Sequence, residues 1–143
     1  MAQIRDAAGG ESVADIRREM RALMMDKVGV YRTAERLDEA VSRLRELKQR
    51  FAGISIMDKG TRWNTELLEA WELGSLLDLA EVTAVTAQAR TESRGAHSRE
   101  DYPDRDDANW LRHSLAWLQP DGGIRLDYKP VKLGLYEPAK RVY

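Results

Sequence analysis

The chain contains no cysteine, which excludes disulfides, thiolate metal sites and cysteine nucleophiles. It also has no apolar run approaching the ~20 residues of a membrane span, and no signal-peptide core follows Met1. Neither sign of charge dominates: 23 lysines and arginines meet 24 aspartates and glutamates, for a net charge of -1. Such a balance gives no overall attraction to nucleic acid or to an anionic membrane surface, so no nucleic-acid partner is expected.

The sequence does contain enough apolar residues for one folded domain. Its 143 residues are 43% hydrophobic and 33% charged, a composition that is globular and charge-rich rather than disordered. Three amphipathic stretches with helical spacing lie before residue 96. Ser12 and Thr33 are suitable N-caps for the first two helices, and Asn64 or Thr65 begins the third.

Each stretch has an apolar stripe from which its buried face is predicted. The first stripe, before a stop near Gly29, is Val13, Ile16, Met20, Leu23, Met24 and Val28. The second, before a stop at Gly53, is Ala34, Leu37, Val41, Leu44, Leu47 and Phe51. The third, with no strong breaker before Gly95, is Leu67, Leu68, Trp71, Leu76, Leu79, Val82 and Val85. Short connections between them predict a mainly α fold, an up-down-up three-helix bundle over residues 11–95.

The flanking segments carry weaker patterns. Residues 1–10 end in two glycines and are interpreted as a linker or a frayed start. Residues 96–143 are predicted to be an irregular C-terminal extension, in which residues 107–118 suit a short helix. Because this extension has little core, its Trp110 and Trp117 are predicted to be interface residues. A turn follows, and a strand with a short β-hairpin is then predicted from the alternation of Ile124, Leu126 and Tyr128.

The densest chemistry lies in residues 90–110, RTESRGAHSREDYPDRDDANW, which hold ten charged residues of both signs and one histidine. Its arginines, with Arg112, could form a basic patch, but the interleaved acids would cancel the field of that patch. We therefore interpret the segment as a loop held by ion pairs, within the chain or across a domain junction. The predicted structural and interface cluster is Arg90, Glu92, Arg94, His97, Arg99, Asp101, Arg105, Asp106, Asp107 and Trp110.

Two functional roles can be considered for His97, as a metal ligand and as a general base. On a helix, His97 and Asp101 would share one face as metal ligands, but Gly95 and Pro103 disfavour a helix and no third ligand has a natural spacing. Imidazole also titrates near neutral pH, so His97 could act as a general base. A structural, hydrogen-bonded histidine is the preferred interpretation, and no metal site is expected.

The order of residues in this segment resembles the C-terminal region of the succinate dehydrogenase and fumarate reductase flavoprotein subunits. The pattern is Arg-x-Glu-Ser-Arg-Gly-x-His from Arg90, Arg-x-Asp-x-Pro-x-Arg-Asp-Asp from Arg99, and Asn-Trp-Leu-x-His from Asn109. The resemblance extends over nearly the whole chain, through Met25, Gly29, Arg32, Trp63, Asn64, Glu72, Leu73, Leu126, Tyr128, Pro130, Val131, Arg141 and Tyr143. L-aspartate oxidase has a similar first block. The Arg-Asp-Asp-x-Asn-Trp continuation and the Arg-x-Tyr ending favour the succinate dehydrogenase branch over it, while fumarate reductase is harder to exclude.

The resemblance implies a spectrin-repeat-like three-helix bundle with a small irregular C-terminal piece. It also implies that the chemistry lies elsewhere: the covalent FAD in a Rossmann-like domain, and the dicarboxylate between that domain and a capping domain. The parent enzyme would oxidise succinate to fumarate and pass electrons to an iron-sulfur subunit and on to quinone. This chain has no GxGxxG fingerprint and no βαβ pattern. We therefore expect no catalytic and no cofactor-binding residue in it, and no activity from it alone.

The resemblance implies partners as well. They are the flavin-binding and capping domains of the same subunit and the iron-sulfur subunit. Contact with the membrane would be indirect, on the cytoplasmic side of a bacterial inner membrane or the matrix side in a eukaryote. The chain would be an excised C-terminal domain or the product of a split gene, and its exposed surfaces could pair in a non-physiological homodimer. The alternative from another class is a stand-alone helical adaptor.

Overall fold

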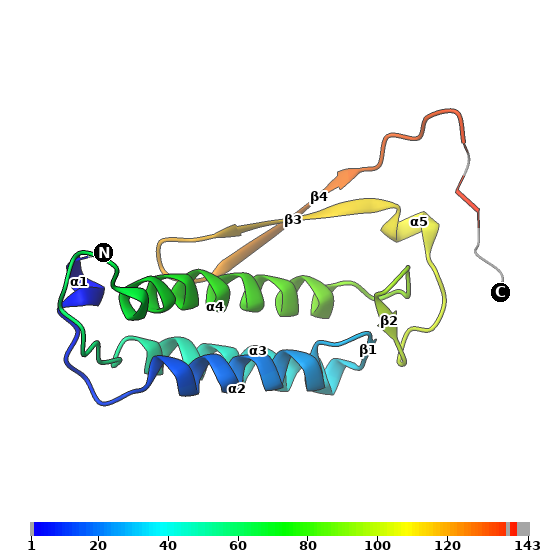
Figure 1. The fold of residues 1–143 in the computed structure, drawn as a ribbon. Coiled ribbons are helices and arrows are strands. Elements are labelled where there is room, and N and C mark those ends of the chain that lie inside the picture. The colour runs from blue at the N-terminus through cyan, green and yellow to red at the C-terminus, as the bar shows by residue number, and fades with distance from the viewer. Residues whose placement is uncertain (1, 137, 140–143) are drawn as a thin grey trace.

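Three long helices form the body of the protein in the computed structural model, which describes residues 2–136 and 138–139. They are α2 (Val13–Lys27), α3 (Ala34–Phe51) and α4 (Thr65–Ala89), which run up, down and up, with α4 packed across the other two (Figure 1). The predicted mainly α bundle is therefore confirmed. Within the described ranges, no helix pairs the length with the apolarity that a membrane-spanning helix requires. Arg141 and Tyr143, part of the resemblance, lie outside the described residues.

Short elements surround the bundle. They are α1 (Ala2–Arg5), β1 (Tyr31–Arg32), β2 (Ser98–Arg99), α5 (Asp107–Trp110), β3 (Arg112–Leu118) and β4 (Ile124–Pro130). β1 and β2 pair in parallel at one end of the bundle, whereas β3 and β4 form an antiparallel hairpin that lies across α4 on the side away from α2 and α3 (Figure 1). The fold thus brings residues 90–110 to the end of the bundle where α3 begins and α4 finishes.

The three helices begin where the sequence predicts, because each predicted N-cap accepts a backbone hydrogen bond. The side-chain oxygen of Ser12 accepts from the amide of Asp15 at 3.2 Å, and that of Thr33 accepts from Arg36 at 3.3 Å. Asn64 caps α4 through the amide of Leu67 at 2.7 Å. Each cap satisfies one of the amides that a helix start leaves without a partner.

The core is built as predicted in two helices and differently in the third. In α2 and α3 the buried residues come from the predicted stripes, except that Ala40 is buried without being predicted and the predicted Ala34 is exposed. In α4 the predicted face is wrong: Leu68, Trp71 and Leu79 are 47%, 49% and 62% exposed. The buried residues of α4 are instead Ala70, Leu73, Leu77, Ala80, Glu81, Ala84 and Ala87. Four alanines therefore face inward beside Leu73 and Leu77 and let α4 approach its neighbours, while Leu68, Trp71 and Leu79 face outward.

The helix predicted over residues 107–118 is also wrong beyond its first turn. Only Asp107–Trp110 is helical, and residues from Arg112 onward pair with β4 in a register that joins Arg112 to Pro130 and Leu118 to Ile124. The leucine, alanine and tryptophan of this segment suit a helix in isolation. Cross-strand pairing with the alternating strand after the turn overrides that preference. The predicted hairpin is present and is longer than expected.

Residues 2–11 differ from the predicted linker or frayed start, because they are tied to the far end of the bundle. The amide of Gly9 donates to the Ile54 carbonyl at 3.0 Å, and that of Glu11 donates to the Gly53 carbonyl at 3.0 Å. Lys59 Nζ donates to the carbonyls of Arg5 and Ala7 at 2.9 and 2.8 Å. Extended backbone at residues 8–11 and 53–56 therefore closes this end of the core.

The close approach at Gly9 gives a paired prediction. A Cβ on Gly9 would lie 2.0 Å from the Gly53 carbonyl oxygen, whereas a Cβ on Gly10 would meet nothing within 4 Å. We expect Gly9→Ala to lower the free energy of unfolding by about 1–3 kcal/mol, because two backbones must separate. Gly10→Ala should leave it within about 0.5 kcal/mol. Urea unfolding followed by circular dichroism measures both, and equal midpoints would contradict the close approach.

Candidate functional site

Arg99 and Asp101 form an ion pair that joins two helix ends. The guanidinium of Arg99 is 1% exposed and donates to both carboxylate oxygens of Asp101 at 2.7 Å. Its Nη1 also donates to the carbonyls of Ala87, Gln88 and Arg90, at 3.1–3.2 Å, where α4 ends. These carbonyls have no partner within the helix, and a cation is favoured at this negative end of the helix dipole.

Asp101 completes the bridge at the start of α3. Its Oδ2 accepts a hydrogen bond from the amide of Ala34 at 2.9 Å, the position at which a helix favours a negative charge. The hydrogen bonds from Arg99, together with that from Ala34 and against a smaller effect of burial, lower the pKa of Asp101 to about 2. The pair therefore holds the end of α4 and the beginning of α3 with one set of charges.

His97 is held on both sides by groups of this chain. Its Nδ1 lies 2.6 Å from Arg32 Nη1, and its Nε2 lies 3.2 Å from the Arg90 carbonyl oxygen. A guanidinium can only donate, so Nδ1 accepts and Nε2 carries the donated proton. Burial lowers the pKa of His97, the hydrogen bond to the Arg90 carbonyl opposes this, and the charge of Arg32 adds to it. His97 is therefore a neutral imidazole of fixed tautomer.

Glu92 is the centre of a second network. Its side chain is fully buried and forms ion pairs with Arg90 and Arg94, the latter through both carboxylate oxygens at 2.9 and 3.0 Å. The backbone amide of Asp106 donates to the same carboxylate at 2.9 Å. Burial raises the pKa of Glu92, but the hydrogen bonds from Arg94, Asp106 and Arg90 outweigh it and hold that pKa below its usual range.

The network continues into α5 and its surroundings. Arg94 donates to Asp107 at 2.6 Å, and Arg105 pairs with the same carboxylate. Asp106 caps α5 by accepting from the Asn109 amide at 3.0 Å. All ten residues of the predicted cluster therefore lie in these two networks or beside them, with Trp110 against Arg90. Their role at an interface stays a prediction.

Trp110 lies inside the chain, in contrast to the predicted interface position. It is 7% exposed, and its indole Nε1 donates to Thr91 Oγ1 at 3.1 Å. Its ring meets that of Tyr128 edge-on, with centroids 5.5 Å apart, so the hairpin supplies the core that the sequence did not reveal. Trp117, the other predicted interface tryptophan, is 39% exposed. The most exposed tryptophan is Trp63, at 98%.

Sequence reasoning missed several partners of these residues. Arg32 holds His97, yet it precedes α3 and nothing in its local pattern predicts a contact with a residue 65 positions later. Glu81 was also missed. It is 2% exposed within α4 and accepts from Arg45 and Lys48 at 2.9 and 2.8 Å. An acid four residues after Leu77, on the small-residue side of the helix, was the available signal.

The geometry gives no reason to place a metal ion or a dinucleotide on this part of the chain. Within residues 2–136 and 138–139, no three histidine or acidic side chains are arranged to hold a metal ion. The two-residue strands β1 and β2 are the only parallel pair described, and no glycine-rich turn leads from either into a helix. The described residues therefore lack the strand–turn–helix unit that binds a dinucleotide, and no chemical step is assigned to them.

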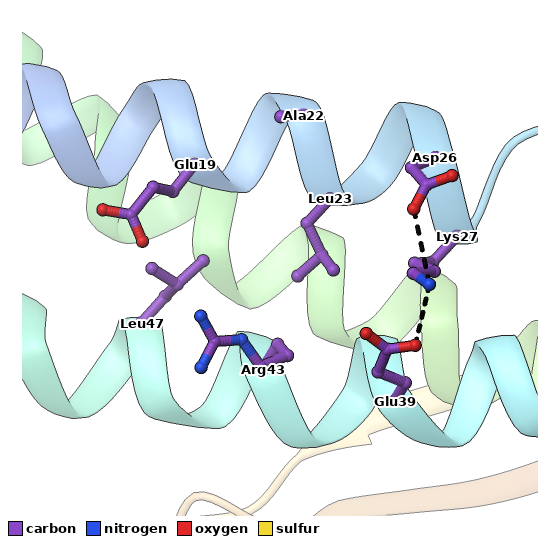
Figure 2. Close-up of a pocket in the computed structure, with 8 residues that line it drawn as sticks. All are labelled: Glu19, Ala22, Leu23, Asp26, Lys27, Glu39, Arg43 and Leu47. Carbon is purple, nitrogen blue, oxygen red and sulfur yellow. Dashed lines mark ion pairs between the residues drawn. The ribbon is translucent and has the colours of Figure 1, made fainter.

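A surface groove between α2 and α3 carries charges that are paired within the chain. Figure 2 shows Lys27 between Asp26 and Glu39, at 3.4 and 2.8 Å. Glu19, in the same groove, pairs with Arg50 at 2.7 Å, and Arg43 pairs with Glu46 on its own helix. Since each charge has a partner, the groove is explained by helix packing.

This architecture is a three-helix bundle with an antiparallel hairpin along its longest helix and networks of buried ion pairs at one end. A family described as "Fumarate reductase flavoprotein C-term" matches residues 17–143. The chain belongs to the C-terminal domain family of the succinate dehydrogenase and fumarate reductase flavoprotein subunits.

Relatives of both names are about equally similar. The succinate dehydrogenase flavoprotein subunit of Rickettsia bellii is 46% identical over 99% of this chain and 25% of its own length. The fumarate reductase flavoprotein subunit of Escherichia coli is 47% identical over 94% of this chain and 23% of its own length. A solved structure of E. coli quinol fumarate reductase FrdA superposes with a TM-score of 0.91 at 46% identity, over 96% of this chain and 24% of that one. The chain thus spans about a quarter of the length of these relatives.

Proposed function

We propose that this chain is a non-catalytic C-terminal domain that braces the flavin-binding part of a succinate dehydrogenase flavoprotein subunit. The observation that carries the proposal is the outward face of α4. Leu68, Trp71, Leu76 and Leu79 recur at helical spacing and are 39–62% exposed. Large apolar side chains that gather on a face the chain leaves uncovered are typical of a surface that meets other protein.

The position of this face on the helix supports the proposal. The hairpin turn, at Asp121 and Gly122, lies beside Glu81, so the hairpin covers the C-terminal part of α4. The exposed leucines and Trp71 all precede Glu81 in α4, where the hairpin leaves the helix uncovered. Trp63, just before α4, adds a 98% exposed indole on a residue with φ of 56°. A left-handed backbone is costly for a bulky residue, and such strain is commonest at functional sites.

The charged networks would give this face a rigid support. Because Arg99 and Asp101 join the end of α4 to the beginning of α3, these two helix ends would keep their relative position when another domain packs against α4. In the parent complex, the FAD, the substrate and the capping domain would then belong to the part of the subunit that precedes this domain. The iron-sulfur subunit would be a neighbour, and attachment to the membrane would be peripheral.

Succinate oxidation is our proposal for the direction of the parent reaction. The terminal segment, from Leu126 to the Arg-x-Tyr ending, resembles that of succinate dehydrogenase and supports it. The test is a steady-state assay of the full-length flavoprotein complex in both directions. Faster fumarate reduction than succinate oxidation would overturn this part and leave the bracing role untouched.

The bracing role predicts that outward apolar residues matter for assembly and not for folding of the chain. We expect Leu68→Gln with Trp71→Gln to change the free energy of unfolding of the isolated chain by less than about 1 kcal/mol, because both are half exposed. The same pair, in an E. coli fumarate reductase flavoprotein whose C-terminal quarter is replaced by this chain, should strongly reduce the yield of assembled, flavin-loaded complex. Gel filtration with flavin absorbance measures that yield.

The matched control is Met25→Gln, since Met25 is 81% exposed but lies on α2. That chimera should assemble like the unmodified one. If the chimera with Leu68→Gln and Trp71→Gln assembles as well as the unmodified chimera, the outward face of α4 does not take part in bracing. Binding of one flavin per chain by the isolated protein would contradict a non-catalytic role, and an unmodified chimera that never assembles would favour a stand-alone helical adaptor.

A further inference from the structure

A cleft of about 330 Å³, lined by basic side chains, lies between residues 90–97 and the start of the hairpin. Three arginines and two histidines line it, around Trp110: Arg90, Arg94, Arg112, His97 and His113. No acidic side chain is among the lining residues within the described part of the chain. The groove of Figure 2 differs in this respect, because acids and bases alternate along it.

Two of the three arginines are already neutralised. Arg90 pairs with Glu92, and Arg94 pairs with Glu92 and Asp107. Arg90 also donates to the carbonyls of Trp110 and Arg112, so both of its terminal nitrogens are engaged within the chain. These two arginines shape the wall of the cleft and are not its principal free donors.

Arg112 is the arginine in the cleft without an ion-pair partner among the described residues. Its guanidinium carbon lies 3.9 Å from the centre of the Tyr128 ring and 4.6 Å from that of Trp110. Its Nε is buried and has no hydrogen-bond partner in the described structure. A buried donor without an acceptor is costly, and a cation held between two aromatic rings has already lost much of its side-chain freedom. The guanidinium of Arg112 is therefore held in place by the two rings and has no anionic partner among the described residues.

We propose that this cleft binds a carboxylate group, with Arg112 as the pairing donor. The planar fork of a guanidinium matches the two oxygens of a carboxylate, and the adjoining Leu111 and Val131 accommodate a short apolar stem. The negative charge would offset the charge of Arg112 in a cleft that has no acid of its own among the described residues. The carboxylate could be a free ion or an acidic side chain of another protein. This site does not depend on the bracing role, which rests on the opposite half of α4.

The test is a titration of the 143-residue chain with sodium acetate, with sodium chloride as the counterpart at constant ionic strength. Two-dimensional ¹H–¹⁵N spectra follow the Nε–H of Arg112 and the indole N–H of Trp110. Saturable acetate shifts confined to the cleft, absent with chloride, are expected. Shifts that scale with ionic strength alone, or that appear all over the protein, would overturn the proposal.

Variants identify the donor. Arg112→Gln should weaken acetate binding about tenfold or more, since a hydrogen bond to a charged group is lost. Arg125→Gln is the matched control, because Arg125 stacks on Trp117 at 4.0 Å in the same hairpin but outside the cleft. Should Arg112→Gln unfold, Arg112→Lys keeps the charge without the fork and should bind acetate several-fold more weakly. Unchanged binding in the folded Arg112 variant would refute the assignment.

A second titration separates the two sources of the carboxylate. It uses a short peptide with blocked ends and one glutamate. Tighter binding of the peptide than of acetate supports an acidic side chain of another protein, and tighter binding of acetate supports a free ion. Failure of both to bind at the cleft refutes the site, and the assembly of the α4 chimera is unaffected by that failure.

Discussion

Replacing Arg99 with methionine should lower the free energy of unfolding by about 3 kcal/mol, because breaking a buried ion pair leaves its partner uncompensated. Asp101 would lose its bidentate partner, the carbonyls of Ala87 and Gln88 would lose their donor, and that of Arg90 would keep only His97. Methionine keeps most of the apolar stem, so the loss of stability measures the contribution of the guanidinium and not that of side-chain packing. Urea unfolding followed at 222 nm measures the change.

Arg125→Met is the control for Arg99→Met. Arg125 is 53% exposed and lies 4.0 Å from Asp127, so its removal should cost no more than about 0.5–1 kcal/mol. Arg99→Lys is a stricter comparison. An ammonium keeps the charge, but it cannot reach the carboxylate and the carbonyls in one geometry, so only part of the stability should return. Equal unfolding midpoints for Arg99→Met and Arg125→Met would show that the buried pair does not join the helix ends.

The parts of the fold that could be predicted are those with local causes. Ser12, Thr33 and Asn64 mark helix starts because a cap acts within three residues of itself. The stripes of α2 and α3 were also readable, since in these helices apolar residues are bulky and confined to one side. Both signals depend on the chain alone and need no knowledge of what packs against it.

The orientation of α4 could not be predicted for a physical reason. Apolar bulk points outward at Leu68, Trp71 and Leu79, while the inward side is mostly alanine. The hydrophobicity of the residues predicts that the face with bulky side chains is buried, whereas close packing between helices favours burial of the face with small side chains. The error is informative, because large apolar side chains of α4 that face away from the core of the bundle support the proposal that this face meets other protein.

The sequence predicted which residues of the candidate site would form ion pairs, but not which partner each of them would contact. Interleaved charges in residues 90–110 predicted ion pairs, and the structure contains them. That Arg99 would reach the end of α4, or that Arg32 would hold His97, depends on the pairing of β1 with β2. The short strands themselves have no periodic signal. Contacts of that range arise from the assembled bundle.

Glu92→Gln should destabilise the chain as much as any single change, by about 3–5 kcal/mol, because it removes the charge at the centre of a buried network. The amide keeps the shape of the side chain, but it turns a donor toward Arg90 or Arg94. Arg94 would then keep only Asp107 as an acid, Arg90 would have no acidic partner among the described residues, and the Asp106 amide would lose a charged acceptor. Thermal or urea unfolding at neutral pH measures this loss. Glu100→Gln, an exposed acid in the same segment, is the control and should be nearly neutral.

The pH dependence of the stability lost in Glu92→Gln shows whether the loss comes from the charge of the carboxylate or from its packing. The pKa of Glu92 is lower in the folded chain than its ordinary value of 4.5, so the unfolded chain binds its proton first as the pH falls. Its contribution is therefore complete above pH 4.5 and declines as the pH falls through the lowered value. Glutamine does not titrate, so the difference in stability between the wild type and Glu92→Gln should shrink steadily below pH 4.5. A difference that stays constant down to the acid limit would mean that the variant perturbs packing and that the carboxylate is not the centre of the network.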